Sequence, residues 1–136
     1  MRPFKLFITE QFMIARSNMP QIEDVEKFTE WLADDRGVGS WPYMGLVSAY
    51  KPLQAEGFDS NKVNTIEMDM LENPDTSSMN PIIVSEDGYV IDGHHRYIAA
   101  INLQIKIPYI VVDTTANKVL KLAYEYVEAS DYNSED

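Results

Sequence analysis

An acid, two imidazoles and a guanidinium occur within five consecutive residues, Asp92-Gly93-His94-His95-Arg96. The apolar run before them predicts a strand, and the apolar pattern after them predicts a helix. The first N–H groups of a helix lack partners within it, and the helix dipole adds partial positive charge at that end. The sequence therefore predicts a strand-to-helix loop that holds a phosphate or a similar anion.

Each residue of this loop has an expected role. Gly93 lacks the Cβ that would obstruct a phosphate, and the Arg96 guanidinium can bind two phosphate oxygens as a fork. Asp92, at the end of the strand, can cap the helix or bind a metal ion. His94 and His95 point about 100 degrees apart on a helix, so they need different roles. Each can donate to phosphate, and an imidazole also serves as an acid or base near neutral pH.

A purely structural interpretation competes with this one. It makes Asp92 a helix cap, one histidine a core residue and Arg96 half of a surface salt bridge. For any one of these residues alone the structural interpretation is favoured. For all of them within five positions after a hairpin, the anion site is the stronger interpretation.

The elements around the loop are well defined by their apolar patterns and turn residues. The expected order is a strand at 81–85, a turn at Glu86-Asp87-Gly88, a strand at 89–92, a helix from Gly93 to about Leu103, a strand at 107–113 and a last helix capped by Thr114 or Thr115. This order places Asp92 to Arg96 at one end of a small sheet.

The first half of the chain gives weaker signals. Apolar spacing predicts a helix over 21–35, with Pro20 at its first turn. Glycines and a proline then predict a loop over 36–42. We expect the stretch from Gly37 to Tyr43 to close over the ligand as a lid through Trp41 and Tyr43; the alternative is that Trp41 packs into the core. We expect a second helix between Tyr43 and Phe58 and a strand from Val63 to Leu71, followed by a polar loop.

Composition limits the classes of function. The chain has 136 residues, 45% of them hydrophobic, which favours a single globular domain. No cysteine is present, which excludes thiol chemistry. No apolar segment approaches the ~20 residues of a membrane helix, so we expect a cytoplasmic protein that binds no membrane. The formal charge of −11 disfavours nucleic acid as a partner.

The sequence from Pro81-Ile82-Ile83-Val84 through Gly88 to Ala100 and on to Ile107-Pro108-Tyr109-Ile110-Val111-Val112 resembles the core of the ParB/sulfiredoxin superfamily. The resemblance covers roughly Val63 to Asp113, with Val63 to Leu71 in the place of the leading strand. It implies an α+β fold: a small mixed sheet with flanking helices, to which this chain adds an N-terminal helical extension. The expected parts are a helical region 1–62, the core 63–113, a helix 114–129 and an acidic tail 130–136.

The resemblance also implies a nucleotide phosphate site. Sulfiredoxins carry a catalytic cysteine where this chain has His94, so their activity is excluded. The Asp-Gly-His-His-Arg form looks most like ADP-dependent free serine kinases, in which a glutamate on or just after the leading strand is the base. Glu67, Asp69 and Glu72 are the candidates, and Glu72 is preferred because a loop carboxylate can reach the end of the sheet.

Two departures from the family pattern stand out. The stretch from Glu72 to Asn80 is shorter than the helical insertion that usually precedes the Pro-Ile-Ile-Val strand, so we expect the N-terminal helices to supply part of the pocket wall. The helix-turn-helix segment of partitioning proteins does not follow the core, which argues against a DNA clamp.

Four hypotheses follow. The leading one is an enzyme, a kinase-like transferase or a nucleotide hydrolase, that binds ATP or ADP with Mg²⁺ and transfers a phosphoryl group to a small hydroxyl acceptor or to water. Its catalytic residues would be Glu72, His95 and Asp92, its nucleotide ligands Gly93, His94, His95 and Arg96, and its metal ligand Asp92. The others are a ParB-like nuclease or nucleic-acid-binding module, a non-enzymatic nucleotide sensor or acidic regulator, and, ranked lowest, a two-histidine metal site.

Overall fold

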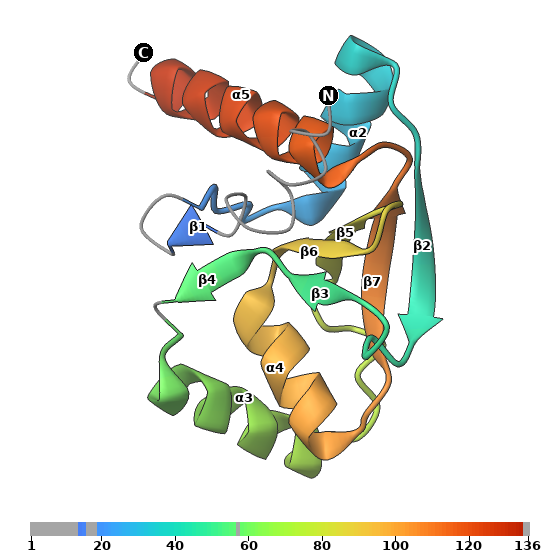
Figure 1. Cartoon of the computed structure of the whole chain (residues 1–136), viewed down its shortest axis with the longest axis vertical. Helices are drawn as coiled ribbons and strands as arrows, with labels where there is room; N and C mark the ends of the chain where they lie inside the picture. The colour runs from blue at the N-terminus through green and yellow to red at the C-terminus, as the bar shows by residue number, and fades with distance from the viewer. Residues whose placement is uncertain (1–13, 16–18, 57, 135–136) are drawn as a thin grey trace, which may run out of the picture.

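A five-stranded mixed sheet forms the centre of the structure, a computed structural model that describes residues 14–15, 19–56 and 58–134 (Figure 1). Its strands follow the order β2-β7-β5-β6-β3, and a second, two-stranded sheet pairs β1 with β4 in parallel. The elements in chain order are β1 (Ile14–Ala15), α2 (Val25–Arg36), β2 (Ser40–Gly45), β3 (Lys51–Pro52), β4 (Gln54–Glu56), α3 (Ser60–Glu72), β5 (Ile82–Ser85), β6 (Tyr89–Asp92), α4 (His94–Leu103), β7 (Ile107–Val112) and α5 (Ala116–Ser134).

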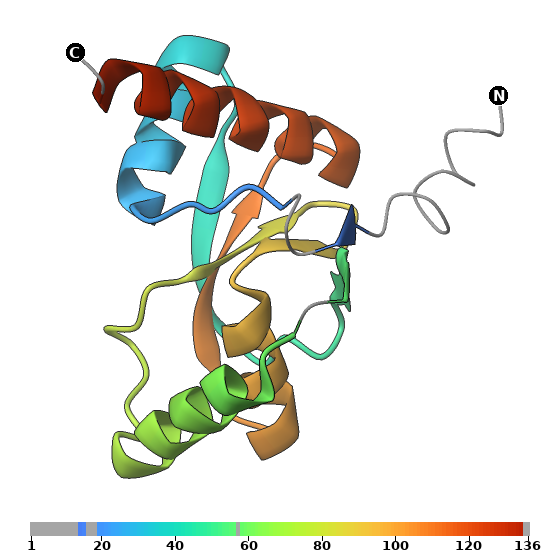
Figure 2. The same cartoon turned by 90° about the vertical axis from the view of Figure 1, so that its left-hand side faces the viewer.

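Helices cover both faces of the sheet, which gives two separate cores (Figure 2). Side chains along a strand alternate between the faces. Ile83 therefore packs with α2 and α5, whereas its neighbours Ile82 and Val84 pack with α3 and α4. Every residue of β5 is buried, as expected for a central strand covered on both sides.

The predicted path from β5 through β6 and α4 to β7 is confirmed. Gly88 lies in the turn with a positive φ of 98°, which a glycine tolerates. β6 returns antiparallel to β5, and β7 lies parallel to β5 on its other side. The loop residues Asp92 to Arg96 thus lie where β6 ends and α4 begins.

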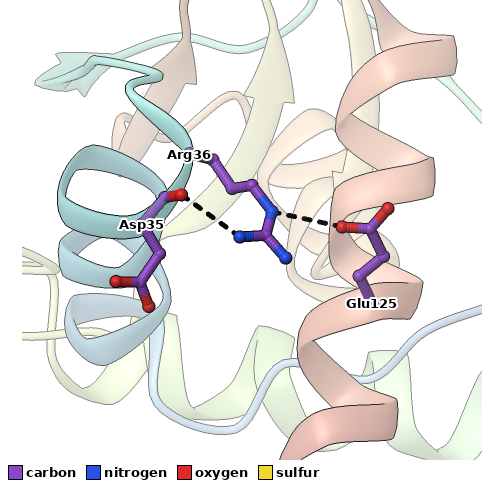
Figure 3. A network of polar contacts seen from close by, with 3 residues as sticks. All are labelled: Asp35, Arg36 and Glu125. Carbon is purple, nitrogen blue, oxygen red and sulfur yellow. Dashed lines mark hydrogen bonds and ion pairs between the residues drawn. The ribbon is translucent and has the colours of Figure 1, made fainter.

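The helices α2 and α5 lie side by side on one face of the sheet. Asp24 caps α2 through its carboxylate and Lys27 N–H, so the helix begins five residues after Pro20 rather than at it. Arg36 at the end of α2 donates from Nε to Glu125 of α5 at 3.3 Å and from Nη1 to the carbonyl of Asp35 (Figure 3). This exposed pair adds little stability, so the buried apolar contacts hold the two helices together.

The hydroxyl of Thr115 accepts from Lys118 N–H at the start of α5, as predicted. The helix then continues to Ser134 and so includes residues expected to form an acidic tail beyond 129.

The predicted helix between Tyr43 and Phe58 is wrong. The segment instead contains the end of β2 and the short strands β3 and β4. β2 is an edge strand whose residues are largely exposed, so it lacks the alternation of apolar and polar residues that would have indicated a strand. Its antiparallel pairing with β7 determines its conformation, and the expected helical character of region 1–62 is limited to α2 and the start of α3 in the described residues.

The predicted strand from Val63 to Leu71 is also wrong, because these residues lie in α3. Asp59 caps this helix by accepting from the N–H groups of Asn61 and Lys62. Val63 and Met70 are buried and Ile66 is partly buried, a spacing of three and four residues that is typical of a helix. A helix therefore does precede β5, and its residues Lys62 and Ile66 form part of the pocket wall that was expected from the N-terminal helices.

The predicted loop over 36–42 is confirmed only for residues 37–39, and the rest of the prediction is wrong. Gly37 ends α2 in the left-handed conformation, but Ser40 already begins β2. Trp41 is 58% exposed and lies in a paired strand, so it is neither a core residue nor part of a loop lid.

The predicted fold class is confirmed: the protein is α+β, with a small mixed sheet and flanking helices. None of the helices in the described residues is long and apolar enough to cross a membrane.

Gly93 and Gly88 offer a test of how the loop is packed. Both have positive φ, so alanine at either should cost about 1 to 2 kcal/mol. A Cβ on Gly93 would also lie 2.7 Å from Ile82 Cγ2 and 2.8 Å from Arg96 Nη2, whereas one on Gly88 meets nothing within 4 Å. We expect Gly93→Ala to cost about 1 to 3 kcal/mol more than Gly88→Ala in urea unfolding. Equal losses would show that the contact with Ile82 and Arg96 is not restrictive.

Candidate functional site

The loop from Asp92 to Arg96 lines a cavity of about 90 Å³ at the start of α4. Ile91 of β6 and three other segments complete the wall: Met19 to Ile22, Gln54 of β4, and Lys62 and Ile66 of α3. A water molecule needs roughly 10 to 15 Å³ of such space, so the cavity accommodates several waters or one phosphate-sized group. It is smaller than the ~300 Å³ at which pockets for whole small molecules begin.

His94 connects the loop to the junction between β3 and β4. Its Nε2 accepts from Leu53 N–H at 3.1 Å and from Gln54 N–H at 3.0 Å. Because this nitrogen is an acceptor, the imidazole is neutral with its proton on Nδ1. Burial lowers the pKa of His94 to about 3, helped by His95 and opposed by a backbone hydrogen bond with Val90.

His95 connects the loop to the beginning of α3. Its Nε2 accepts from Asp59 N–H at 3.0 Å, and its ring lies edge-on to Phe58. The two histidines therefore contact different segments, as the angle between adjacent helical residues predicts. Both Nε2 atoms accept from the backbone, so neither donates to a phosphate from that position.

Asp92 holds the Met19 to Ile22 segment over the cavity. Its Oδ1 accepts from Ile22 N–H at 3.3 Å, and its Oδ2 lies 3.9 Å from Arg96 Nη2. Burial raises the pKa of Asp92 to about 6, against the effects of Arg96, the Ile22 N–H and Lys62. The ion pair is too long for a hydrogen bond, which explains why burial dominates.

Arg96 carries the positive charge of the loop. Its Nη2 donates to the Pro81 carbonyl at 3.3 Å, and its Nε is buried with no hydrogen-bond partner among the described residues. Burial lowers its pKa and Asp92 opposes this, but a guanidinium stays protonated at neutral pH. A buried donor without a partner is costly, and Arg96 as a residue lines the cavity.

Lys62 is a second cation at the cavity that the sequence analysis missed. It lies on the face of α3 that also carries Ile66, four residues later. The mistaken strand over 63–71 hid this relation, since residues four apart are neighbours on a helix but lie about 13 Å apart along a strand. The capping residue Asp59 was the available signal for a helix start.

The structure does not bring Glu72 to the cavity. Glu72 is the exposed last residue of α3. It lines neither this cavity nor a second cavity of about 570 Å³ that shares Ile66 and Arg96 with it. Glu67 accepts from the Asn102 side chain at 2.8 Å and also lies outside both walls. Glu67 and Asp69 lie two residues apart on α3, so they do not share a face of the helix.

The residues of the cavity do not fit a resident Mg²⁺. Of the described residues that line it, Asp92 is the one carboxylate, and both its oxygens already face donors, the Ile22 N–H and the Arg96 guanidinium. Among the described residues no group of three or more histidines and carboxylates could hold a metal ion. Arg96 and Lys62 make the site suitable for an anion instead.

No protein-family model matches the chain. A ParB-like protein of Sulfolobus acidocaldarius is 40% identical over 62 residues, which are 44% of this chain and 31% of that protein. The match thus spans less than one third of the relative. It supports a ParB-like relationship, which the mixed sheet with flanking helices fits.

The neutral imidazole of His94 should make the fold sensitive to acid. The pKa of about 3 lies below the ordinary 6.5, so the stabilisation is complete above 6.5 and is lost as the pH falls towards 3. Between about pH 7.5 and about pH 5 the loss from His94 should be about 2 kcal/mol. In His94→Gln the amide oxygen replaces Nε2 as a neutral acceptor, so this loss should disappear.

Urea unfolding of both proteins at the two pH values measures the difference. Asp92 titrates in the same range with the opposite sign, since its pKa of about 6 is raised, but it is present in both proteins and cancels. If His94→Gln loses as much stability in acid as the wild type, the neutral acceptor role of His94 is wrong.

Proposed function

We propose that the chain is a phosphate-binding module, and that the cavity at the start of α4 binds the phosphates of a nucleotide such as ADP or ATP. The observation that carries the proposal is the convergence of Arg96 and Lys62 on this cavity in a chain with a formal charge of −11. Acidic residues outnumber basic ones by 22 to 11 in the whole chain. The cavity wall has the opposite balance, with two basic side chains and one acidic side chain around a space for one phosphate.

Three kinds of donor would meet the phosphate oxygens. Gly93 gives α4 no side-chain cap, so the first N–H groups of the helix, at the positive end of its dipole, have no side-chain acceptor from Gly93, and the residues that carry them line the cavity. The Arg96 guanidinium and the flexible ammonium of Lys62 are the two positively charged side chains in the cavity wall. The Arg96 guanidinium meets the Asp92 carboxylate only at the limit of an ion pair, so a phosphate would give it a further anionic partner.

We further propose that the site catalyses phosphoryl transfer from the nucleotide to a hydroxyl acceptor or to water. Asp92 is better placed than Glu72 to be the base, because it lines the cavity. Its pKa of about 6 lies close to neutral pH, where a general base is most effective. His95 lines the same cavity, but its Nε2 lone pair is engaged by Asp59 N–H.

A nucleic-acid-binding module is the second candidate, and the ParB-like relative favours it. In this case the phosphate in the cavity would belong to a polynucleotide backbone. The charge of −11 acts against it, since each further backbone phosphate meets an acidic surface.

The nucleotide proposal predicts that ADP or ATP raises the melting temperature. Ligand at ~100 times Kd should add about 2.7 kcal/mol to the stability of the folded state. Arg96→Met keeps the apolar stem but lacks the guanidinium, so the shift should vanish. Arg96→Lys should restore little of it because an ammonium cannot form the fork. Lys62→Ala should reduce the shift.

Thermal-shift measurements with and without Mg²⁺ test this. Lys118→Ala of α5 is the control for Lys62→Ala, because it also removes one lysine charge but lies outside the cavity, and it should leave the shift unchanged. No shift in the wild type with millimolar nucleotide would refute the proposal. A shift that persists in Arg96→Met would place the nucleotide elsewhere.

The two candidates differ in the affinity for DNA that they predict. If the nucleotide proposal holds, random duplex DNA should bind at physiological salt no tighter than the non-specific range of about 10⁻⁴ to 10⁻⁶ M. Fluorescence anisotropy with labelled duplex measures this. Submicromolar binding that is lost in Arg96→Met, or metal-dependent cleavage of a plasmid that is lost in His95→Ala, would put the nucleic-acid module first.

A further inference from the structure

The strand β2 forms an open edge of the central sheet. It is the outer strand in the order β2-β7-β5-β6-β3, and among the described residues it pairs only with β7 (Figure 1). The Gly39 carbonyl accepts from Asp113 N–H at the β7 end of this pairing. Because backbone directions alternate along an antiparallel strand, Ser40, Pro42 and Met44 point their carbonyls away from β7. The open edge thus presents a row of hydrogen-bond acceptors.

This edge lacks the usual protection against other chains. Sheet edges of soluble proteins are commonly guarded by charged side chains, especially lysine, or kept very short. β2 has six residues, and the whole stretch from Gly37 to Tyr50 contains no charged residue. Trp41, Tyr43 and Met44 are exposed on it instead. Pro42 has no N–H, so the edge accepts hydrogen bonds better than it donates them. A chain that pairs with it must supply donors.

A groove of about 640 Å³ lies beside the same edge, between β2 and the start of α2. We call it the α2–β2 groove. Ser40 and Pro42 line it from β2, and Glu23, Asp24 and Glu26 line it from the other side of the groove, so every charged residue that the structure places in its wall is acidic. The remaining lining residues are uncharged: Val25, Thr29, Asn80, Pro81 and Ile110.

The three carboxylates of the groove are not equally engaged. Asp24 Oδ1 accepts from Lys27 N–H as the cap of α2. Glu23 and Glu26 are exposed, and neither has an ion-pair partner among the described residues. These two carboxylates are therefore available to an incoming cation.

Charge selects the kind of chain that fits the edge and the groove. A second copy of this chain has the same formal charge of −11 and would bring the same acidic groove with it. A polynucleotide is repelled for the same reason. A segment rich in lysine or arginine is attracted, and its ammonium or guanidinium groups are the donors that carbonyls and carboxylates need. Such a cation also stacks on an exposed indole, which Trp41 provides.

We propose that the β2 edge and the α2–β2 groove bind an extended, basic segment of a protein partner. The backbone of this segment lies beside β2 as an added strand, and its lysine or arginine side chains reach the carboxylates of Glu23 and Glu26. The groove shares no lining residue with the cavity at the start of α4. The interaction is therefore a further function of the chain and does not depend on the phosphate ligand.

A labelled peptide of alternating lysine and valine is the probe, since alternation places its lysines on one face of an extended chain. Fluorescence anisotropy with the full chain at physiological salt should show saturable binding of this peptide, and no binding when glutamate replaces lysine. Glu23→Gln/Glu26→Gln should weaken binding about tenfold, because it removes two exposed charge pairs. Glu30→Gln/Asp34→Asn is the matched control, since it removes the same charge from α2 outside the groove, and it should bind as the wild type does.

A lysine at the open edge tests the strand pairing. Trp41→Lys removes the indole and repels a basic chain, so binding of the lysine peptide should be lost. The side chain of Trp41 is exposed, so the fold should be retained. Leu71→Lys introduces the same charge in place of an exposed apolar residue on α3 and should leave binding unchanged.

Four results would overturn the proposal. The first is a wild type that does not bind the lysine peptide. Equal weakening in the two double variants would assign binding to the overall charge of the chain rather than to the groove. Binding that persists in Trp41→Lys would place the peptide away from the β2 edge. A wild-type dimer in analytical ultracentrifugation that is lost in Trp41→Lys would assign the edge to a second copy of the chain.

Discussion

The structure around the site depends on acceptor atoms in the loop after β6. His94 accepts two backbone N–H groups from the β3–β4 junction, His95 accepts one at the start of α3, and Asp92 accepts one from Ile22. Each of the three side chains thereby fixes one wall of the cavity. An imidazole can accept at Nε2 only when that nitrogen has no proton, so the arrangement requires a neutral His94. Burial keeps His94 in this neutral form because it lowers the pKa of the imidazole.

This use of the histidines leaves the positive charge of the site to other residues. Arg96 and Lys62 come from helices that pack against each other, α4 and α3, so the packing of these helices also fixes the spacing of the charges. Asp92 opposes them, and its raised pKa makes it the group at the site most easily neutralised near pH 6. An anion would thus enter a cavity whose walls are held by hydrogen bonds and whose charges are incompletely paired.

The sequence predicted the part of the fold in which local signals agree. The hairpin turn at Gly88, the apolar strands and the helix after Gly93 all have strong local patterns, so β5 to β7 and the loop were predictable. The segment 40–72 was not. β2 is an exposed edge strand defined by its partner, and α3 was mistaken for a strand although Asp59 marks its start. Lys62 and the partners of His94 depend on this segment and could not be found without it. Asp92, His95 and Arg96 were predicted, but their contacts are set by tertiary structure.

The central claim is that a phosphate binds where α4 begins, between Arg96 and Lys62. Amide NMR measures this most directly, because it reports on each N–H group of the cavity wall in the wild-type protein. Titration with pyrophosphate should shift the amide signals of His94, His95 and Arg96 most, followed by those of Gln54 and Lys62, while those of α5 stay unchanged. Saturable shifts confined to other surfaces, with the signals of the first turn of α4 unmoved, would contradict the account.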